Sequence, residues 1–198
     1  MADVYDWPDD ICPSSLTWRL ESSTRTFRSP FNGTSQTVRT PGSRWVCSLT
    51  FSNQSDAQAR RIEALLAALD GEYGRVRLRD KGRDGRNPAG APVVSDPNQS
   101  GVLLFTRGWA ASRLVLRAGD YITVNDELKM VTADITSAAD GTASIQIAPM
   151  LRTAPPANAA IEVAAPYGIF KLKDNSQGNA SRVPGVFTSF AIEFEEAF

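Results

Sequence analysis

The sequence predicts a mainly β protein: a discontinuous β domain that carries one α-helix, with a small antiparallel β-barrel or sandwich module inserted into it. Three observations support this prediction. Many short stretches alternate apolar and polar side chains, which is the period of a half-buried strand. Turn dipeptides such as Asn32-Gly33 and Pro41-Gly42 separate these stretches. A single stretch, residues 56–70, changes to the helical period.

The first expected strands are residues 14–20 and 44–51, in which apolar side chains occupy every second position. Trp18 and Trp45 fall on these apolar faces, so we expect both in the core. Residues 31–38 between them are typical of a turn followed by another strand.

A helix is predicted over residues 56–70. It begins with Ser55 and Gln58 in the spacing of a capping box, and Gly71 stands where a C-cap is expected. An apolar stripe runs along it, formed by Ile62, Leu65, Leu66 and Leu69. Because a helix this short is marginal alone, the stripe must pack on a sheet.

After the helix, residues 75–80 alternate again and predict a strand. Residues 81–100 are rich in Gly, Pro, Asn and Asp and have no regular period. We expect this segment to be a long exposed loop that acts as an arm toward a neighbouring molecule, since long loops in compact domains are usually functional or mobile.

A second unit is expected over residues 101–173. Short strands joined by turn signals indicate a small antiparallel barrel or sandwich, closed by residues 168–173. The other strands expected in it are 102–105, 113–116, 121–124, 128–131, 144–147 and 161–164.

The chain ends with a predicted strand pair, residues 185–190 and 191–195. Phe190, Ile192 and Phe194 share one face and match the strands near Trp45. We therefore assign residues 1–80 and 180–198 to one discontinuous domain that surrounds the 101–173 unit.

Several function classes lose support from composition. The 198 residues contain no histidine, which removes Ser-His and Cys-His nucleophile pairs. A net charge of −1 argues against a general nucleic-acid binder. No glycine-rich phosphate loop or calcium loop occurs, and the Asp residues stand at turn positions. We expect no enzyme activity, no metal and no cofactor.

The two cysteines, Cys12 and Cys47, are expected to be reduced thiols in a cytoplasm, with a bridge between them as the alternative. The acidic N-terminus lacks the apolar run of a signal peptide, and no segment reaches the length of a membrane span. We expect a soluble product that stays where it is made, or leaves by cell lysis.

Charge and aromatic residues supply the candidate interface. A basic stretch covers residues 75–86 and an acidic edge lies near the C-terminus, which would suit contacts between neighbours in a head-to-tail ring. A phosphate or acidic-partner contact and a merely solvated surface are the alternatives. Trp7 and Trp109 are candidates for exposed interface anchors. The full set is Trp7, Arg75, Arg77, Arg79, Lys81, Arg83, Arg86, Trp109, Glu193, Glu195 and Glu196.

Three stretches resemble tail structural proteins of long-tailed phages and prophages, in particular the distal tail protein at the tail tip or baseplate hub. The first is Arg28-Ser29-Pro30-Phe31-Asn32-Gly33-Thr34-Ser35-Gln36 leading to Arg44-Trp45. The second is the helix up to Tyr73-Gly74-Arg75. The third runs from Leu116-Arg117-Ala118-Gly119-Asp120-Tyr121-Ile122 to Ile147-Ala148-Pro149-Met150-Leu151-Arg152.

The resemblance implies a split β-barrel/sandwich belt domain with one helix, assembled as a six-fold ring, with the 101–173 module facing outward. It implies a virion location in the tail, after synthesis in a bacterial host cytoplasm. The implied partners are the chain itself, the tail tube protein and the tail-tip or hub proteins. DNA would pass through the channel without specific binding, and no membrane is involved.

Alternatives remain open at this point. A head–tail connector or tail terminator protein belongs to the same structural class at another position. A carbohydrate-binding module that contacts the host is a second, although the inserted unit is short and has few aromatic residues. A cell-wall hydrolase using two carboxylates is a third, for which the sequence offers no clear pair.

Overall fold

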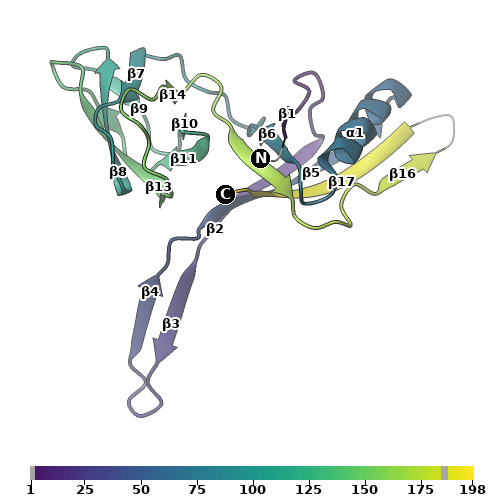
Figure 1. Ribbon diagram of the computed structural model, residues 1–198, viewed down its shortest axis with the longest axis horizontal. Coiled ribbons are helices and arrows are strands. Elements are labelled where there is room, and N and C mark those ends of the chain that lie inside the picture. Colours follow the sequence, from purple (N-terminus) through teal and green to yellow (C-terminus); the bar gives the residue numbers. More distant parts are fainter. Residues whose placement is uncertain (1–2, 184–186) are drawn as a thin grey trace.

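The computed structural model describes residues 3–183 and 187–198. The fold is mainly β, with 49% strand, 7% helix and one α-helix among the described residues. Figure 1 shows two bodies of strands side by side, and a long hairpin that extends away from both. The predicted mainly β class is therefore confirmed.

A seven-stranded sheet forms the first body, in the order β1-β6-β15-β17-β5-β2, with β16 paired to β17. Among the described residues of this sheet, β1 pairs with β6 in parallel and the other strand pairs are antiparallel. The strands are β1 Val4–Asp6, β2 Ser15–Glu21, β5 Arg44–Gln54, β6 Arg75–Leu78, β15 Gly168–Leu172, β16 Ala180–Val183 and β17 Phe187–Glu196.

Helix α1, Asp56–Leu69, covers one face of this sheet (Figure 1). The predicted capping box is present, because Ser55 and Gln58 each accept from the other's backbone N–H. Within the predicted apolar stripe, Ile62 and Leu69 are fully buried. The C-cap lies one residue earlier than expected, at Asp70, which adopts a left-handed conformation with φ of 49°.

A six-stranded sheet forms the second body, in the order β14-β10-β11-β13-β8-β7. It is a nearly closed barrel, because a bridge joins Val93 to Ala160 where the two ends approach. The strands are β7 Gly90–Val94, β8 Gly101–Trp109, β10 Tyr121–Val124, β11 Glu127–Val131, β13 Ala143–Leu151 and β14 Ile161–Glu162, and a small separate pair is formed by β9 Leu114–Leu116 and β12 Ile135–Thr136.

Trp45 joins the two bodies. It lies on β5, and its indole Nε1 donates to the backbone oxygen of Leu128 on β11 at 3.0 Å. The ring of Tyr121, on β10, packs edge-on against the Trp45 ring with centroids 5.3 Å apart. Tyr121 and Leu128 belong to the core cluster of the large sheet although they lie on barrel strands. The two bodies therefore share buried surface.

Buried charges complete this junction. Glu196, on β17, accepts from the Trp45 backbone N–H at 3.0 Å and from Arg152 at 2.5 Å. The side chain of Lys129 is fully buried and lies 2.6 Å from Glu127. Burial lowers the pKa of Lys129, and Glu127 partly offsets this effect. Buried charges need such partners. The Lys129–Glu127 pair lies within β11, and the Arg152–Glu196 pair joins the end of β13 to β17.

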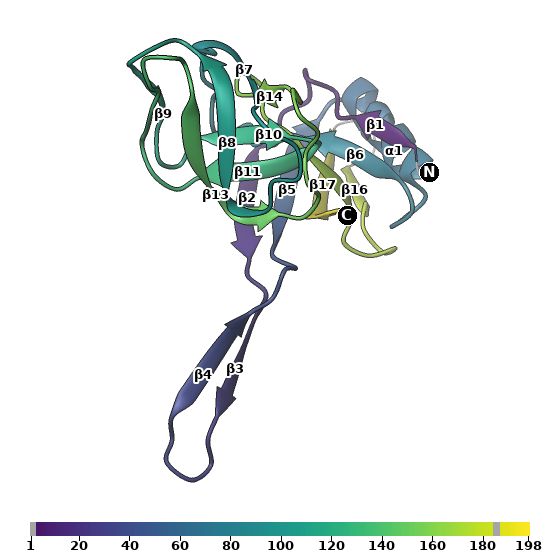
Figure 2. The ribbon, with the colours of Figure 1, turned by 60° about the vertical axis from the view of Figure 1, so that its left-hand side comes forward.

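A long hairpin, formed by β3 Thr24–Arg28 and β4 Ser35–Arg39, projects from the large sheet between β2 and β5. We call residues 22–43 the arm. Figures 1 and 2 show the arm running away from both bodies. The turn expected at Asn32-Gly33 forms its tip, where Gly33 has a φ of 70° and Asn32 Oδ1 accepts from the Thr34 N–H at 3.2 Å.

Two expectations about the middle of the chain are wrong. Residues 81–100 are not one long loop, because 90–94 form β7 and pair with β8. The pattern was hidden by Gly90 and Pro92 within the strand. Residues 168–173 do not close the barrel either. Strand β15 lies in the large sheet between β6 and β17, where Phe170 is fully buried.

The expected C-terminal strand pair is also wrong over the described part. Residues 187–196 form the single strand β17, which pairs with β5, β15 and β16. Residues 185 and 186 of that expectation lie outside the described residues. The apolar alternation of Phe190, Ile192 and Phe194 was read correctly, and all three are buried. The partner strand β16 has four exposed residues, so no burial pattern marked it.

We expect Trp45→Phe to lower the free energy of unfolding by ~1–3 kcal/mol beyond the loss of packing, because the buried Leu128 oxygen loses its donor. Trp18→Phe is the matched control. The Trp18 indole N–H is buried without a hydrogen-bond partner, so that variant loses packing only. Urea unfolding measures both, and equal losses in the two variants would contradict the role given to the Trp45 bond.

Candidate functional site

The basic stretch is held within the chain at its start. Arg75 and Arg77 alternate with the buried Val76 on β6. The Arg75 guanidinium donates to three carbonyls that follow the helix, including Tyr73 at 2.7 Å. Arg77 pairs with Asp6 on β1 at 3.0 Å, and this contact raises the Arg77 pKa. These two residues thus tie β6 to its neighbours.

Arg79 and Lys81 both contact Asp9. Lys81 Nζ lies 3.0 Å from the Asp9 carboxylate, and Arg79 pairs with the same oxygen. The hydrogen bond from Lys81 and the charge of Arg79 lower the pKa of Asp9. The pair therefore holds the N-terminal segment against the end of β6.

Arg83 and Arg86 face the barrel. Arg83 donates to the Gly119 oxygen at 2.7 Å and lies over the Tyr121 ring, 5.2 Å from its centroid. Arg86 pairs with Asp120. Burial raises the pKa of the Tyr121 phenol to about 12. The second half of the basic stretch thus connects the segment after β6 to the barrel.

The acidic end of the chain is also paired internally. Glu193 contacts Lys173 at 2.5 Å, and Glu195 contacts Lys171 at 3.0 Å and Arg44 at 3.3 Å. The carboxylate of Glu196 is buried in the junction. The charges expected to attract a neighbour are therefore largely paired with charges of their own chain.

The expectation that Trp7 and Trp109 are exposed is wrong. Trp7 stacks on Phe51 with ring centroids 5.2 Å apart, and its indole donates to the Ile11 oxygen at 3.0 Å. Trp109 is 5% exposed and donates to Thr106 Oγ1 at 2.7 Å. Each indole has an internal acceptor, which lets the large ring enter the core.

The arm is a candidate interface that sequence reasoning missed. Phe31 at its tip is 97% exposed and Phe27 is 60% exposed. The β3–β4 register places Arg25, Phe27 and Val38 on one face of the hairpin, because Arg25 lies opposite Val38 and Phe27 opposite Gln36. An apolar strip flanked by arginine is thus presented to solvent.

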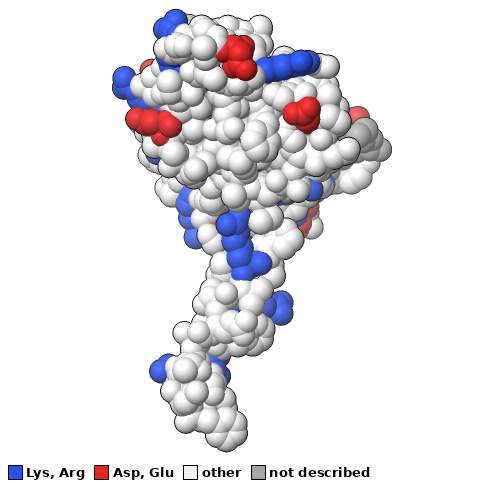
Figure 3. Space-filling model, turned by 90° about the vertical axis from the view of Figure 1, so that its left-hand side faces the viewer, with Lys and Arg blue, Asp and Glu red and all other residues white. Residues whose placement is uncertain are grey.

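The arm carries charge of one sign. It contains Arg25, Arg28 and Arg39 and no acidic residue, and none occurs between Glu21 and Asp56. In Figure 3 the Lys and Arg side chains are distributed down the arm, while the Asp and Glu side chains on this face lie on the body above it. This local excess was the available sequence signal, and the overall charge of −1 concealed it.

The two bodies differ in whether their edge strands are paired. The barrel nearly closes on itself through the Val93–Ala160 bridge. The large sheet ends in β1 on one side and β2 on the other, and each pairs with one strand among the described residues. Open strand edges are templates for pairing with another chain.

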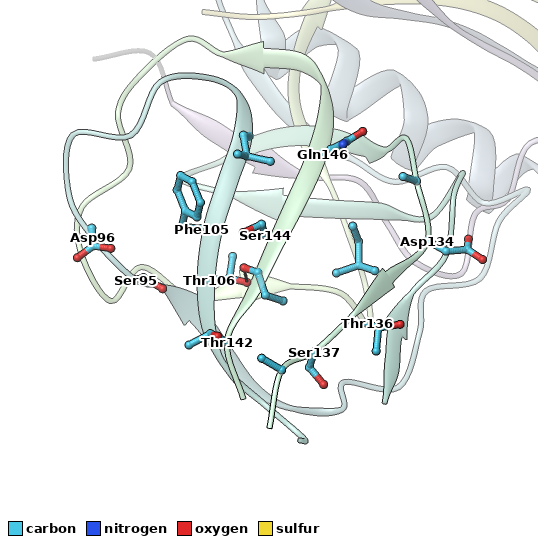
Figure 4. A pocket seen from close by; sticks show the side chains of 15 residues that line it. Ser95, Asp96, Phe105, Thr106, Asp134, Thr136, Ser137, Thr142, Ser144 and Gln146 are labelled. Atoms are coloured by element: carbon cyan, nitrogen blue, oxygen red, sulfur yellow. Dashed lines mark hydrogen bonds between the residues drawn. The ribbon is translucent and has the colours of Figure 1, made fainter. Parts of the chain in front are cut away.

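An open groove of about 710 Å³ lies on the outer face of the barrel (Figure 4). Strands β8 and β13 form its floor, with Phe105 and Ser144 paired across them. Asp96 lies on the Phe105 side and Asp134 on the opposite side, near β12 (Figure 4). Two acidic residues and no Lys or Arg occur among the described residues that line it.

Among the described residues, no cluster of three or more Cys, Asp or Glu side chains is placed to hold a metal ion. Within the same residues, no helix has the length and apolar character needed to cross a bilayer.

Comparison with known proteins gives no family. No protein-family model matches the sequence, and no curated protein matches it.

We expect one fast-reacting thiol in the native protein. Cys12 is exposed and Cys47 is buried between the strands of the large sheet. Burial raises the pKa of the Cys47 thiol, so it stays protonated at pH 8 and unreactive. Titration with a thiol reagent should give one equivalent before unfolding and a second in denaturant. Cys12→Ser should remove the first, and rapid reaction of both thiols in the native state would contradict this assignment.

Proposed function

We propose that this protein is a virion structural protein that forms a six-fold ring at the distal tail of a long-tailed phage. The ring joins the tail tube to the tip or baseplate and leaves a channel through which DNA passes. The chain then serves as a building block and catalyses no reaction.

The arm is the observation that carries this proposal. A two-stranded hairpin alone is marginally stable in water, and no other strand pairs with β3 or β4 within the described chain. Phe31 and Phe27 expose apolar surface to water, and burying that surface would be favourable. Such an element is stabilised when a partner covers it, so the arm indicates assembly.

The open large sheet supports the same conclusion. The exposed edges of β1 and β2 suit contacts with neighbouring copies. An arm on each copy and an acceptor elsewhere on the next copy make a head-to-tail contact, which closes into a ring when the rotation is right. The resemblance of the 28–45, helix and 116–152 stretches to distal tail proteins supplies the proposed place in the tail.

A head–tail connector or tail terminator is the nearest rival, since the same surfaces would serve there. Carbohydrate binding has weaker support, because Phe105 is the one aromatic residue among those that line the groove. Sugar sites usually offer aromatic faces together with polar groups, and a single half-exposed ring is a small platform.

Light scattering and negative-stain images of the purified chain test the proposal. We expect rings with a central hole wide enough for DNA. An armless variant, in which Asn-Gly replaces residues 24–39, should remain monomeric with an unchanged melting temperature. The closure is short because Ser23 Oγ and Thr40 Oγ1 lie 2.7 Å apart.

Labelling of whole particles tests the position. Gold-labelled antibody should mark the tail end farthest from the head, whereas label at the head-proximal end would favour the connector. A chain that stays strictly monomeric at high concentration and is absent from purified particles would rule out the structural role.

A further inference from the structure

We propose that the arm of one copy docks in the acidic groove on the barrel of a second copy. This inference rests on the proposed self-assembly and names the two surfaces that make the contact. The occupant of the groove is then a segment of the same protein, the hairpin of residues 22–43.

Charge complementarity is the first argument. The arm carries Arg25, Arg28 and Arg39 without an acidic residue. The groove carries Asp96 and Asp134 without a basic residue among the described residues that line it. Most of the other charges considered above are already paired within the chain, such as Lys81 with Asp9 and Lys173 with Glu193. The arm is basic and the groove is acidic, so the two surfaces are complementary in charge.

Apolar matching is the second argument. Phe105 stands on the groove floor and is 48% exposed, in the outward row that also contains Leu103. The arm face with Phe27 and Val38 is a flat strip of similar kind. Laying this strip on Phe105 would remove aromatic surface of both copies from water, and Arg25, which shares the face of Phe27, would then face the groove.

The geometry makes the contact one between molecules. The arm extends away from its own barrel (Figures 1 and 2), and no residue of the arm is among the described residues that line the groove of that barrel. From Ser23 to Phe31 the hairpin reaches about 27 Å at ~3.3 Å per residue. The arm therefore spans the gap to a neighbour without disturbing the body that carries it.

The groove is suited to receive a strand pair without rearrangement. Its floor is held by the β8–β13 register, and the Gln99 side chain accepts from the Phe105 N–H at 2.6 Å and donates to the Phe105 oxygen at 3.0 Å. Asp134 accepts from the Ala118 N–H at 2.9 Å, which fixes one wall. Rigid acceptors reduce the entropy lost on binding.

A complementation experiment tests this inference apart from ring formation. One partner is the armless variant, which keeps its groove. The other is Asp96→Lys combined with Phe105→Ser, which keeps its arm. Each should be monomeric alone, and the mixture should form a 1:1 complex that grows no further, because it contains one working arm and one working groove.

Charge reversal then identifies the residues. With the armless variant as acceptor, Arg25→Glu in the arm should weaken the 1:1 complex at least tenfold at low salt, and Arg25→Lys should not. Asp134→Asn in the acceptor should weaken it as well, since the amide keeps the Oδ1 acceptor for Ala118 and loses only charge. Combining Arg25→Glu with acceptor Asp96→Lys should recover part of the affinity.

Asp84→Arg in the acceptor is the matched control, because Asp84 does not line this groove. Melting temperatures exclude misfolding. Absence of the 1:1 complex, or equal binding by acceptors with and without the groove substitutions, would overturn the docking. Rings formed by the full chain that carries Asp96→Lys and Phe105→Ser would also overturn the docking, while leaving the proposed function intact. Glycan-array binding by the armless variant that is lost with Phe105→Ser would assign the groove to a sugar instead.

Discussion

The contact of Trp45 with the backbone of β11 is the interaction on which the rest of the structure depends. The indole crosses from the large sheet to the Leu128 oxygen, and Tyr121 packs against its ring. Glu196 holds the Trp45 backbone and draws Arg152 to the same point. A bond between two sheets is effective here because it is buried and each partner is rigid. Together with the contacts of Arg83 and Arg86, it holds the barrel against the large sheet that carries the arm.

The charged residues predicted to form an interface are also used inside the fold. Most of the cations from Arg75 to Arg86 pair with Asp6, Asp9 or Asp120. The acids near the C-terminus pair with Lys171, Lys173, Arg44 and Arg152. Exposed pairs of this kind contribute little stability each. The arm is different, since Arg25, Arg28 and Arg39 have no acid near them in sequence. Attraction at long range is therefore concentrated at the part that projects furthest.

Local rules predicted much of the fold and little of the site. The capping box at Ser55, the alternation around Trp45 and the Asn32-Gly33 turn were readable because each depends on neighbours in sequence. The membership of β15 in the large sheet depends on pairing across almost a hundred residues and carries no local sign. Trp7 was misjudged because its acceptor, the Ile11 oxygen, is a backbone atom that any sequence would offer.

The arm was overlooked for a related physical reason. Alternation reports burial, and no face of β3 or β4 is buried, so the sequence indicated a turn and a strand over residues 31–38 but neither β3 nor the projecting hairpin. The arm is distinguished by an exposed aromatic residue at its tip, Phe31, together with charges of one sign. A segment that keeps strand pairing without a core of its own has its stability completed by another surface. The barrel is nearly closed and the large sheet is open, and in the proposed assembly a neighbouring copy would supply that surface.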